Sequence, residues 1–119
     1  MKPSQVKALD KLFSEIIRLR ANGFCEHCEK WVKVEGIVAS HFYGRVRKSV
    51  RWDEDNVQGI CNQCHLDFHN DHTDYFNWLY IRLGPERLCL LADKAESIMK
   101  MDYESVKERL QNRIKELER

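Results

Sequence analysis

The chain has almost no net charge, no long hydrophobic run, no internal repeat and no low-complexity segment. Its 20 basic residues balance 19 acidic ones, which leaves a formal charge of +1 over 119 residues. Bulk charge therefore does not indicate a nucleic-acid partner. No apolar run approaches the roughly 20 residues of a bilayer span, and the N-terminal MKPSQVKALDK lacks the apolar segment of a secretory signal. We therefore expect no membrane association.

Length and composition favour one folded domain. A chain of 119 residues can bury a single modest core. With 43% hydrophobic and 33% charged residues, the sequence resembles neither a membrane protein nor a disordered one.

Four of the five cysteines form two CxxC pairs, Cys25 with Cys28 and Cys61 with Cys64. This spacing is typical of a tetrahedral zinc site, whereas a redox dithiol needs only one pair. Four sulfur ligands leave no open coordination position, so we expect Zn²⁺ to be structural and to fold the segment. Such a site without a secretory signal favours a reducing, cytoplasmic setting. Cys89, in the apolar run LCLL, is expected to be a buried thiol.

Hydrophobic periodicity and turn residues predict an α+β fold. We expect an amphipathic helix over 5–20, ended by Asn22-Gly23, and short strands over 30–35, 37–42 and 57–60. Further helices are expected over 64–70 and 74–83, from Pro85 through Ala95, and after an N-cap at Asp102. Trp31 and Trp52 are expected in the core, and His27 on the surface of the first cysteine knuckle.

One loop is basic although the protein is not. Between Gly36 and Trp52 there are four cations and no carboxylate. These cations are candidates for binding DNA phosphates, which gives affinity without sequence readout: Arg45, Arg47, Lys48 and Arg51. For Arg51 we keep a second interpretation, in which it braces the turn at Asp53 and Asp55.

Histidines and an asparagine occur around the second cysteine pair. His65 and His69 are four residues apart, so on a helix they share a face and can share a metal ion. His41 ends a predicted strand fifteen residues before Asn56, and Asn56 precedes His65 by nine. Over about 24–72, this order resembles the HNH nucleases, whose ββα-metal finger crosses a β-hairpin with a helix around one divalent cation. A two-CxxC zinc ribbon is a common variant of that family.

The resemblance implies a role for each position. His41 matches the general base, and neutral imidazole is suited to accept a proton from water near pH 7. Asn56 matches the residue that braces the loop and orients the base. His65 and His69 match the ligands of a catalytic divalent cation (Mg²⁺, Mn²⁺ or another transition metal), which neutralises charge on the phosphate.

One position departs from the family pattern. Many members place a further His or Asp ligand just before the base, where this chain has Ser40. Asp67, Asp71 and His72 are candidates to replace it. Two imidazoles favour a transition metal, whereas Mg²⁺ prefers oxygen, so the sequence leaves the metal open.

A narrower resemblance extends into the C-terminal part. ASHF, RWDEDNVQGICNQC, YFNWLYIRLGPERL and KMDYESVKERL are similar to segments of the phage NinG/Rap recombination endonucleases. That resemblance implies cutting of branched DNA, such as Holliday junctions and D-loops, in a bacterial cell that carries a phage or prophage. His65 departs from it, since asparagine is expected there in many members.

Together these patterns predict a single domain, 1–119, with a zinc-stapled ββα-metal (HNH) finger. The expected parts are an N-terminal helix (1–23), a zinc ribbon and HNH finger (24–72) and a helical tail (73–119). The predicted function is a metal-dependent DNA endonuclease selective for branched DNA, acting as a homodimer because symmetric junction resolution needs two active sites. The alternatives are a site-specific HNH nuclease of homing, restriction or packaging type, and a non-catalytic zinc-ribbon DNA-binding module.

Overall fold

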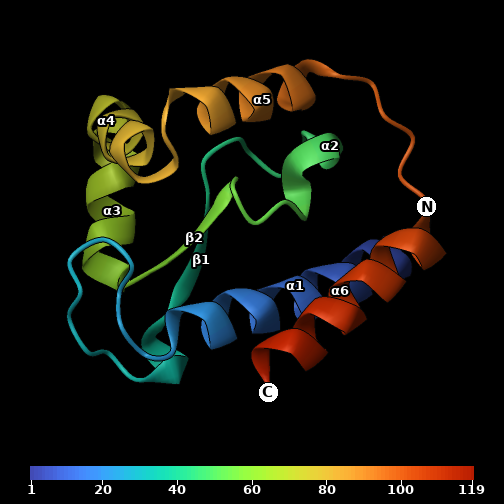
Figure 1. The fold of residues 1–119 in the computed structure, drawn as a ribbon, viewed down its shortest axis with the longest axis horizontal. Helices are drawn as coiled ribbons and strands as arrows, with labels where there is room; N and C mark the ends of the chain where they lie inside the picture. The colour runs from blue at the N-terminus through green and yellow to red at the C-terminus, as the bar shows by residue number, and fades with distance from the viewer.

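A two-stranded β-hairpin lies between two groups of helices in the computed structural model, which describes residues 1–119 (Figure 1). One group contains α3, α4 and α5, and the other contains α1 and α6. In chain order the elements are α1 (Pro3–Ala21), the 3-10 turn η1 (Val34–Gly36), β1 (Val38–His41), α2 (Lys48–Arg51), β2 (Val57–Ile60), α3 (Asn62–Asn70), α4 (His72–Leu83), α5 (Pro85–Glu96) and α6 (Tyr103–Leu117). The chain is therefore a small α+β protein, as the periodicity predicts.

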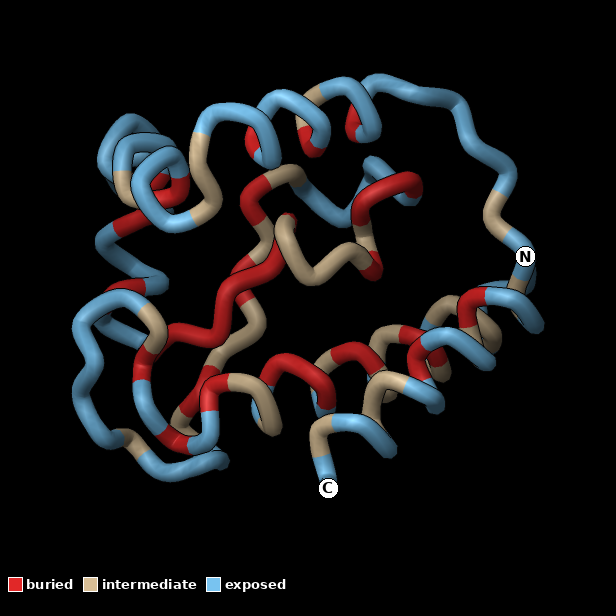
Figure 2. Tube along the Cα trace, in the orientation of Figure 1, coloured by how far each residue is buried: buried red, intermediate tan, exposed pale blue.

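The hairpin is antiparallel and pairs Val38 with Ile60 and His41 with Val57. All four residues of β2 are buried, because helices cover it (Figure 2). At Gly59 a Cβ atom would come within 3.0 Å of Ile17 Cγ2 on α1. Glycine therefore lets α1 lie directly on the hairpin.

The apolar stripe of α1 packs against α6, the last helix, and the two enclose one core. This cluster consists of Leu9, Phe13, Ile16, Ile17, Trp52, Val57, Val106 and Leu110. Trp52 is only 1% exposed, which confirms its predicted place in the core. The apolar stripe of α6 therefore covers the core residues of α1, which brings the first and last helices side by side.

A second core lies on the other side of the hairpin. Its members come from the cysteine pairs, the residue after β1, and α2, β2, α3, α4 and α5: Cys25, Phe42, Val50, Ile60, Cys61, Cys64, Phe68, Tyr75, Leu79, Leu88, Leu91 and Ala95. The rings of Phe68 and Tyr75 stack with centroids 4.4 Å apart and so join α3 to α4. This core supports the second cysteine pair and the histidine-bearing helix.

The predicted strand over 30–35 is wrong. Trp31 forms only an isolated bridge with Phe24, and Val34–Gly36 forms a 3-10 turn. Lys33 has φ of 66°, a left-handed conformation that breaks any extended run. The prediction that Trp31 lies in the core is also wrong, because its side chain is 55% exposed and rests over Gly23.

Cys89 is exposed, which corrects the prediction of a buried thiol. Leu88, Leu91 and Ala95 are the residues of α5 that face the core, and the helical period turns Cys89 away from them. None of the helices combines the length and the hydrophobicity that a membrane span requires.

Candidate functional site

The four cysteines of the two CxxC pairs converge on one point, although 33 residues separate Cys28 from Cys61. Their sulfur atoms all lie within 4.8 Å of one another. Cys25, Cys61 and Cys64 are buried, and Cys28 is exposed. Four thiols at this separation are a donor set suited to tetrahedral zinc, so the cluster can hold a zinc ion.

Backbone N–H groups donate hydrogen bonds to two of the four sulfurs. The Cys28 N–H donates to Cys25 Sγ at 3.4 Å, and the Cys64 N–H donates to Cys61 Sγ at 3.4 Å, which also caps α3. Burial opposes ionisation of Cys25, but the backbone hydrogen bonds, that from Cys28 foremost, lower its pKa to about 7. Burial and the neighbouring thiols raise the pKa of Cys64. Sulfurs crowded in this way are stabilised together by a cation.

Two side chains beside the first cysteine pair connect the cluster to the rest of the fold. His27 places Nδ1 3.2 Å from Cys64 Sγ, and its ring lies 4.6 Å from that of Phe68. Glu26 is nearly buried between Arg20 and Arg82 and accepts a hydrogen bond from the Gly59 N–H at 2.5 Å. His27 therefore contacts the sulfur cluster as well as covering the cysteine knuckle. The sequence analysis assigned no role to Glu26, although the position of Glu26 between Cys25 and Cys28 was a signal that could have been used.

A separate pocket of about 200 Å³ brings His41, at the end of β1, together with His65 and His69 of α3. The remaining lining residues are Ser40, Phe42, Gly44, Phe68, His72 and Tyr75. The cysteines are the only group of three or more possible metal ligands whose donor atoms lie within 4.8 Å of one another. The pocket is thus an imidazole-lined hollow, distinct from the sulfur cluster.

His41 has a fixed orientation. Its Nε2 lies 3.2 Å from the carbonyl oxygen of Arg51, and because a carbonyl can only accept, Nε2 carries the proton in the neutral ring. Nδ1 then keeps its lone pair. Burial, followed by the positive charge of Arg45, lowers the pKa of His41. The ring is therefore neutral near pH 7 and has one nitrogen free to accept a proton.

Asn56 is completely buried and holds the start of the loop that follows β1. Its Oδ1 accepts from the Tyr43 N–H at 2.8 Å, and its Nδ2 donates to the carbonyls of Tyr43 at 3.0 Å and Val50 at 3.1 Å. The Val50 carbonyl precedes the Arg51 carbonyl that contacts His41. Asn56 thus fixes the backbone one residue before the carbonyl that contacts His41.

The four cations of the basic loop differ in whether their side chains form hydrogen bonds within the protein. Arg45 and Lys48 are exposed, whereas Arg47 donates to the Ala95 carbonyl at 3.3 Å. Arg51 forms two hydrogen bonds to Asp10 of α1, at 2.6 and 3.0 Å. Neither sequence interpretation of Arg51 foresaw Asp10 as its partner.

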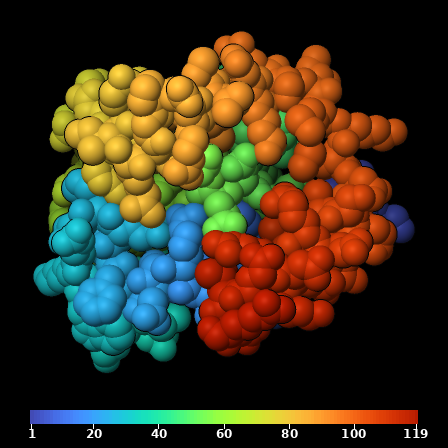
Figure 3. Space-filling view, in the orientation of Figure 1, coloured from blue at the N-terminus to red at the C-terminus, as the bar shows by residue number.

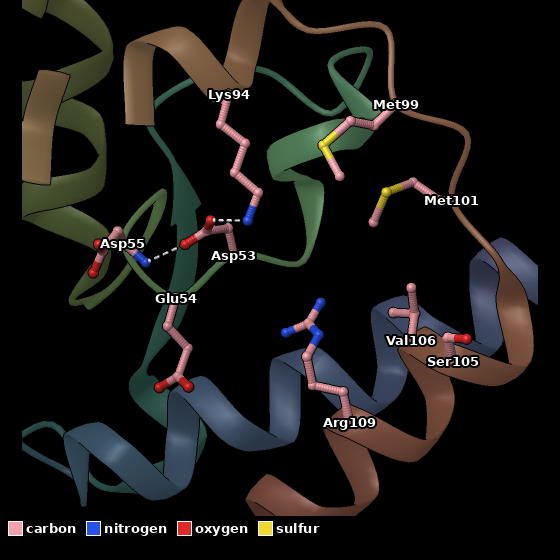
Figure 4. A pocket seen from close by; sticks show the side chains of 9 residues that line it. All are labelled: Asp53, Glu54, Asp55, Lys94, Met99, Met101, Ser105, Val106 and Arg109. Atoms are coloured by element: carbon pink, nitrogen blue, oxygen red, sulfur yellow. Dashed lines mark hydrogen bonds and ion pairs between the residues drawn. The ribbon is translucent and has the colours of Figure 1, made fainter. Parts of the chain in front are cut away.

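The acidic turn that follows the basic loop is braced by α5 and α6 instead. Lys94 pairs with Asp53 at 2.7 Å, Arg113 pairs with Glu54 at 2.9 Å, and Arg87 pairs with Asp55. A hollow of about 500 Å³ opens beside this turn, between α5 and α6, with Lys94, Met99 and Arg109 on its walls (Figures 3 and 4). It contains no histidine or cysteine, so it offers neither the imidazoles nor the thiols of the other two sites.

The four residues considered as a further metal ligand lie in different surroundings. The Ser40 hydroxyl accepts a hydrogen bond from Tyr75 Oη at 3.2 Å, and Asp71 caps α4 through the Asp74 N–H. Asp67 accepts from Gln63 and lies on the side of the cysteine cluster. His72 is the one whose side chain is exposed and lines the imidazole pocket, where it stacks on Phe42 with ring centroids 4.7 Å apart.

The comparisons with known proteins give no relative: no protein-family model, curated protein or solved structure matches the chain.

Proposed function

We propose that the protein is a metal-dependent DNA endonuclease of the HNH type. The observation that supports this most directly is the pocket in which His41 of β1 meets His65 and His69 of α3. The four cysteines form a separate cluster. In this proposal the thiols are the ligands of a structural metal site, and the imidazoles are the ligands of a second site that is open to substrate.

In the proposed mechanism His41 is the general base. Its Nε2–H donates to the Arg51 carbonyl, and Nδ1 accepts the proton of the water that attacks the phosphorus atom. The lowered pKa of His41 keeps that nitrogen available near neutral pH. Asn56 is a positioning residue, because its amide fixes the loop that carries the Arg51 carbonyl.

His65 and His69 would hold the catalytic divalent cation, with His72 as a third candidate ligand on the rim of the pocket. When bound, the cation supplies neutralisation of the charge that develops on the phosphate and the departing 3′ oxygen. A set of two or three imidazoles favours a later transition metal such as Co²⁺ or Ni²⁺ over Mg²⁺.

The proposed substrate is branched DNA from phage or prophage recombination. Arg45 and Lys48 are exposed on the loop that follows Gly44 of the pocket, and they suit contact with backbone phosphates, which recognises DNA without reading its sequence. A homodimer would supply two such pockets for the two strands of a junction.

A cleavage assay tests the proposal. Wild-type protein is incubated with a four-way junction and with a linear duplex of the same sequences, in the presence of Mg²⁺, Mn²⁺, Co²⁺ or Ni²⁺. We expect cleavage that His41→Ala and His69→Ala abolish while DNA binding is retained. Leu66→Ala is the control, because Leu66 is exposed on the same helix and does not line the pocket.

Each alternative function predicts a different result in this assay. Equal cutting of junction and duplex at defined sequences would favour a site-specific HNH nuclease. Binding without cleavage under every metal condition would refute the nuclease and leave a zinc-ribbon DNA-binding module.

A further inference from the structure

The basic loop and the segment after α5 form a groove of about 430 Å³ that the proposed cleavage mechanism does not use. Its lining contains two cations and no carboxylate: Val46, Arg47, Lys48, Ser49, Ala95, Ser97, Ile98 and Met99. Figure 4 shows Met99 beside α2, on the chain that leads from α5 to α6. The charge of this groove is complementary to a phosphate backbone.

Two aliphatic side chains stand out of this groove. Val46 is 90% exposed and Ile98 is 104% exposed, and they come from segments more than fifty residues apart. A single exposed aliphatic residue is ordinary on a protein surface. Val46 and Ile98, in contrast, line the same groove together with two cations.

The segment that carries Val46 is held in place. Ser49 Oγ donates to the Lys94 carbonyl at 2.6 Å, Arg47 donates to the Ala95 carbonyl, and the side chain of Val50 is fully buried. The loop is thus tied to the end of α5, from which the chain continues to Ile98. Because this segment is already ordered, contact between Val46 and a ligand would cost little further conformational entropy.

The groove and the imidazole pocket are neighbours in the sequence of the basic loop. Gly44 lines the pocket, and Val46, two residues later, lines the groove. The same loop thus contributes to both features.

We propose that Val46 and Ile98 form a wedge that separates stacked bases while Arg47 and Lys48 hold the backbone. Apolar side chains flanked by cations unstack and kink DNA in this way, and a branch point, where stacking is already interrupted, is the least costly place to do so. The inference rests on the proposed function in that it needs DNA as the ligand. It assigns the choice of branched DNA to this groove and not to the histidines.

Fluorescence of 2-aminopurine tests the wedge without any cleavage. The base is placed next to the branch of a four-way junction, and the 119-residue chain is added without any further divalent cation beyond the zinc it carries. We expect a several-fold rise in fluorescence on binding, since unstacking relieves quenching. The double variant Val46→Ser/Ile98→Ser should bind with less than about a tenfold loss of affinity, because the phosphate contacts remain, but should give no rise.

The matched control is Ile81→Ser/Leu90→Ser, which removes two exposed aliphatic residues from α4 and α5 outside the groove. It should behave as wild type. A rise that persists in the Val46/Ile98 variant, or no rise with wild-type protein bound to the junction, would overturn the wedge. Cleavage without unstacking refutes the wedge alone, and unstacking by a protein that never cleaves refutes the nuclease alone.

Discussion

Nε2 of His41 lies 3.2 Å from the carbonyl oxygen of Arg51, and the guanidinium of the same Arg51 is clamped by Asp10 of α1. Trp52, the next residue, donates its indole N–H to the same carboxylate at 2.9 Å. The orientation of the imidazole thus depends on a carboxylate 31 positions earlier in the chain. The first helix is therefore part of the support of the candidate site.

The cleavage rate should rise with pH through a pKa below the ordinary histidine value and be constant at neutral pH. The reason is that His41 must be neutral to accept a proton, and burial and Arg45 lower its pKa. Arg45→Gln should move the midpoint to higher pH by removing one positive charge. Single-turnover rates from about pH 5 to 8 measure this; a midpoint above about 6.5 in wild-type protein contradicts it.

Asp10→Asn should destabilise the fold by about 1–2 kcal/mol at neutral pH, since the bidentate ion pair with Arg51 is lost. Burial opposes the Asp10 charge, but hydrogen bonds from Arg51 and Trp52 outweigh it and lower the Asp10 pKa. The contribution is then present above the unfolded-state pKa and is lost as the pH falls through the folded-state value. Urea unfolding at neutral and acid pH should show the difference between the two proteins shrinking in acid.

Glu15→Gln is the control for this comparison, because Glu15 is exposed on the same helix. It should leave the unfolding free energy within about 0.5 kcal/mol of wild type. A similar loss in both variants would mean that the charge of α1, and not the clamp on Arg51, is responsible.

His27→Phe should release zinc faster than wild-type protein. The substitution keeps an aromatic ring against Phe68 and removes the ring nitrogen that lies 3.2 Å from Cys64 Sγ. Outer hydrogen bonds of this kind typically change metal affinity about 10–100-fold. Zinc transfer to a chromophoric chelator measures the rate, with Cys89→Ser as the control, since Cys89 is exposed and far along the chain. Wild-type retention in His27→Phe would assign the histidine a packing role only.

DNA affinity should lose salt dependence when the exposed cations of the loop are removed. Arg45→Ala and Lys48→Ala should each lower the slope of log K against log salt by about 1, because each gives up one phosphate contact. Arg51→Gln should leave the slope unchanged and reduce stability, since its guanidinium is paired with Asp10. Titrations at several salt concentrations distinguish the two behaviours, and a reduced slope in Arg51→Gln would show that the ion pair opens on DNA.

The parts of the fold that the sequence predicts well depend on local signals. Asn22 ends α1 in the left-handed conformation, Pro85 begins α5, and the Asp102 carboxylate caps α6 through the Ser105 N–H. The strand over Val57–Ile60 and the approach of the two CxxC pairs also follow the pattern. Each of these features is determined within a few residues or by a shared ligand chemistry.

The features that sequence reasoning missed depend on tertiary contacts of the residues concerned. Trp31 alternates as a strand residue should, yet it is drawn over Gly23 next to the cysteine knuckle. Arg51 finds its partner on α1, and no local pattern indicates a contact across 41 residues. For Trp31 and Arg51, contacts made in the folded structure determine the environment of the side chain, and the adjacent sequence does not show them.

The pairing of the first and last helices affects the order of events during synthesis. Leu9, Phe13 and Ile16 leave the ribosome almost a hundred residues before Val106 and Leu110, which cover them. Until α6 docks, α1 is an exposed amphipathic surface, and Asp10 on that helix is not yet fixed against Arg51. The backbone carbonyl that orients His41 is therefore supported only after α6 has been synthesised.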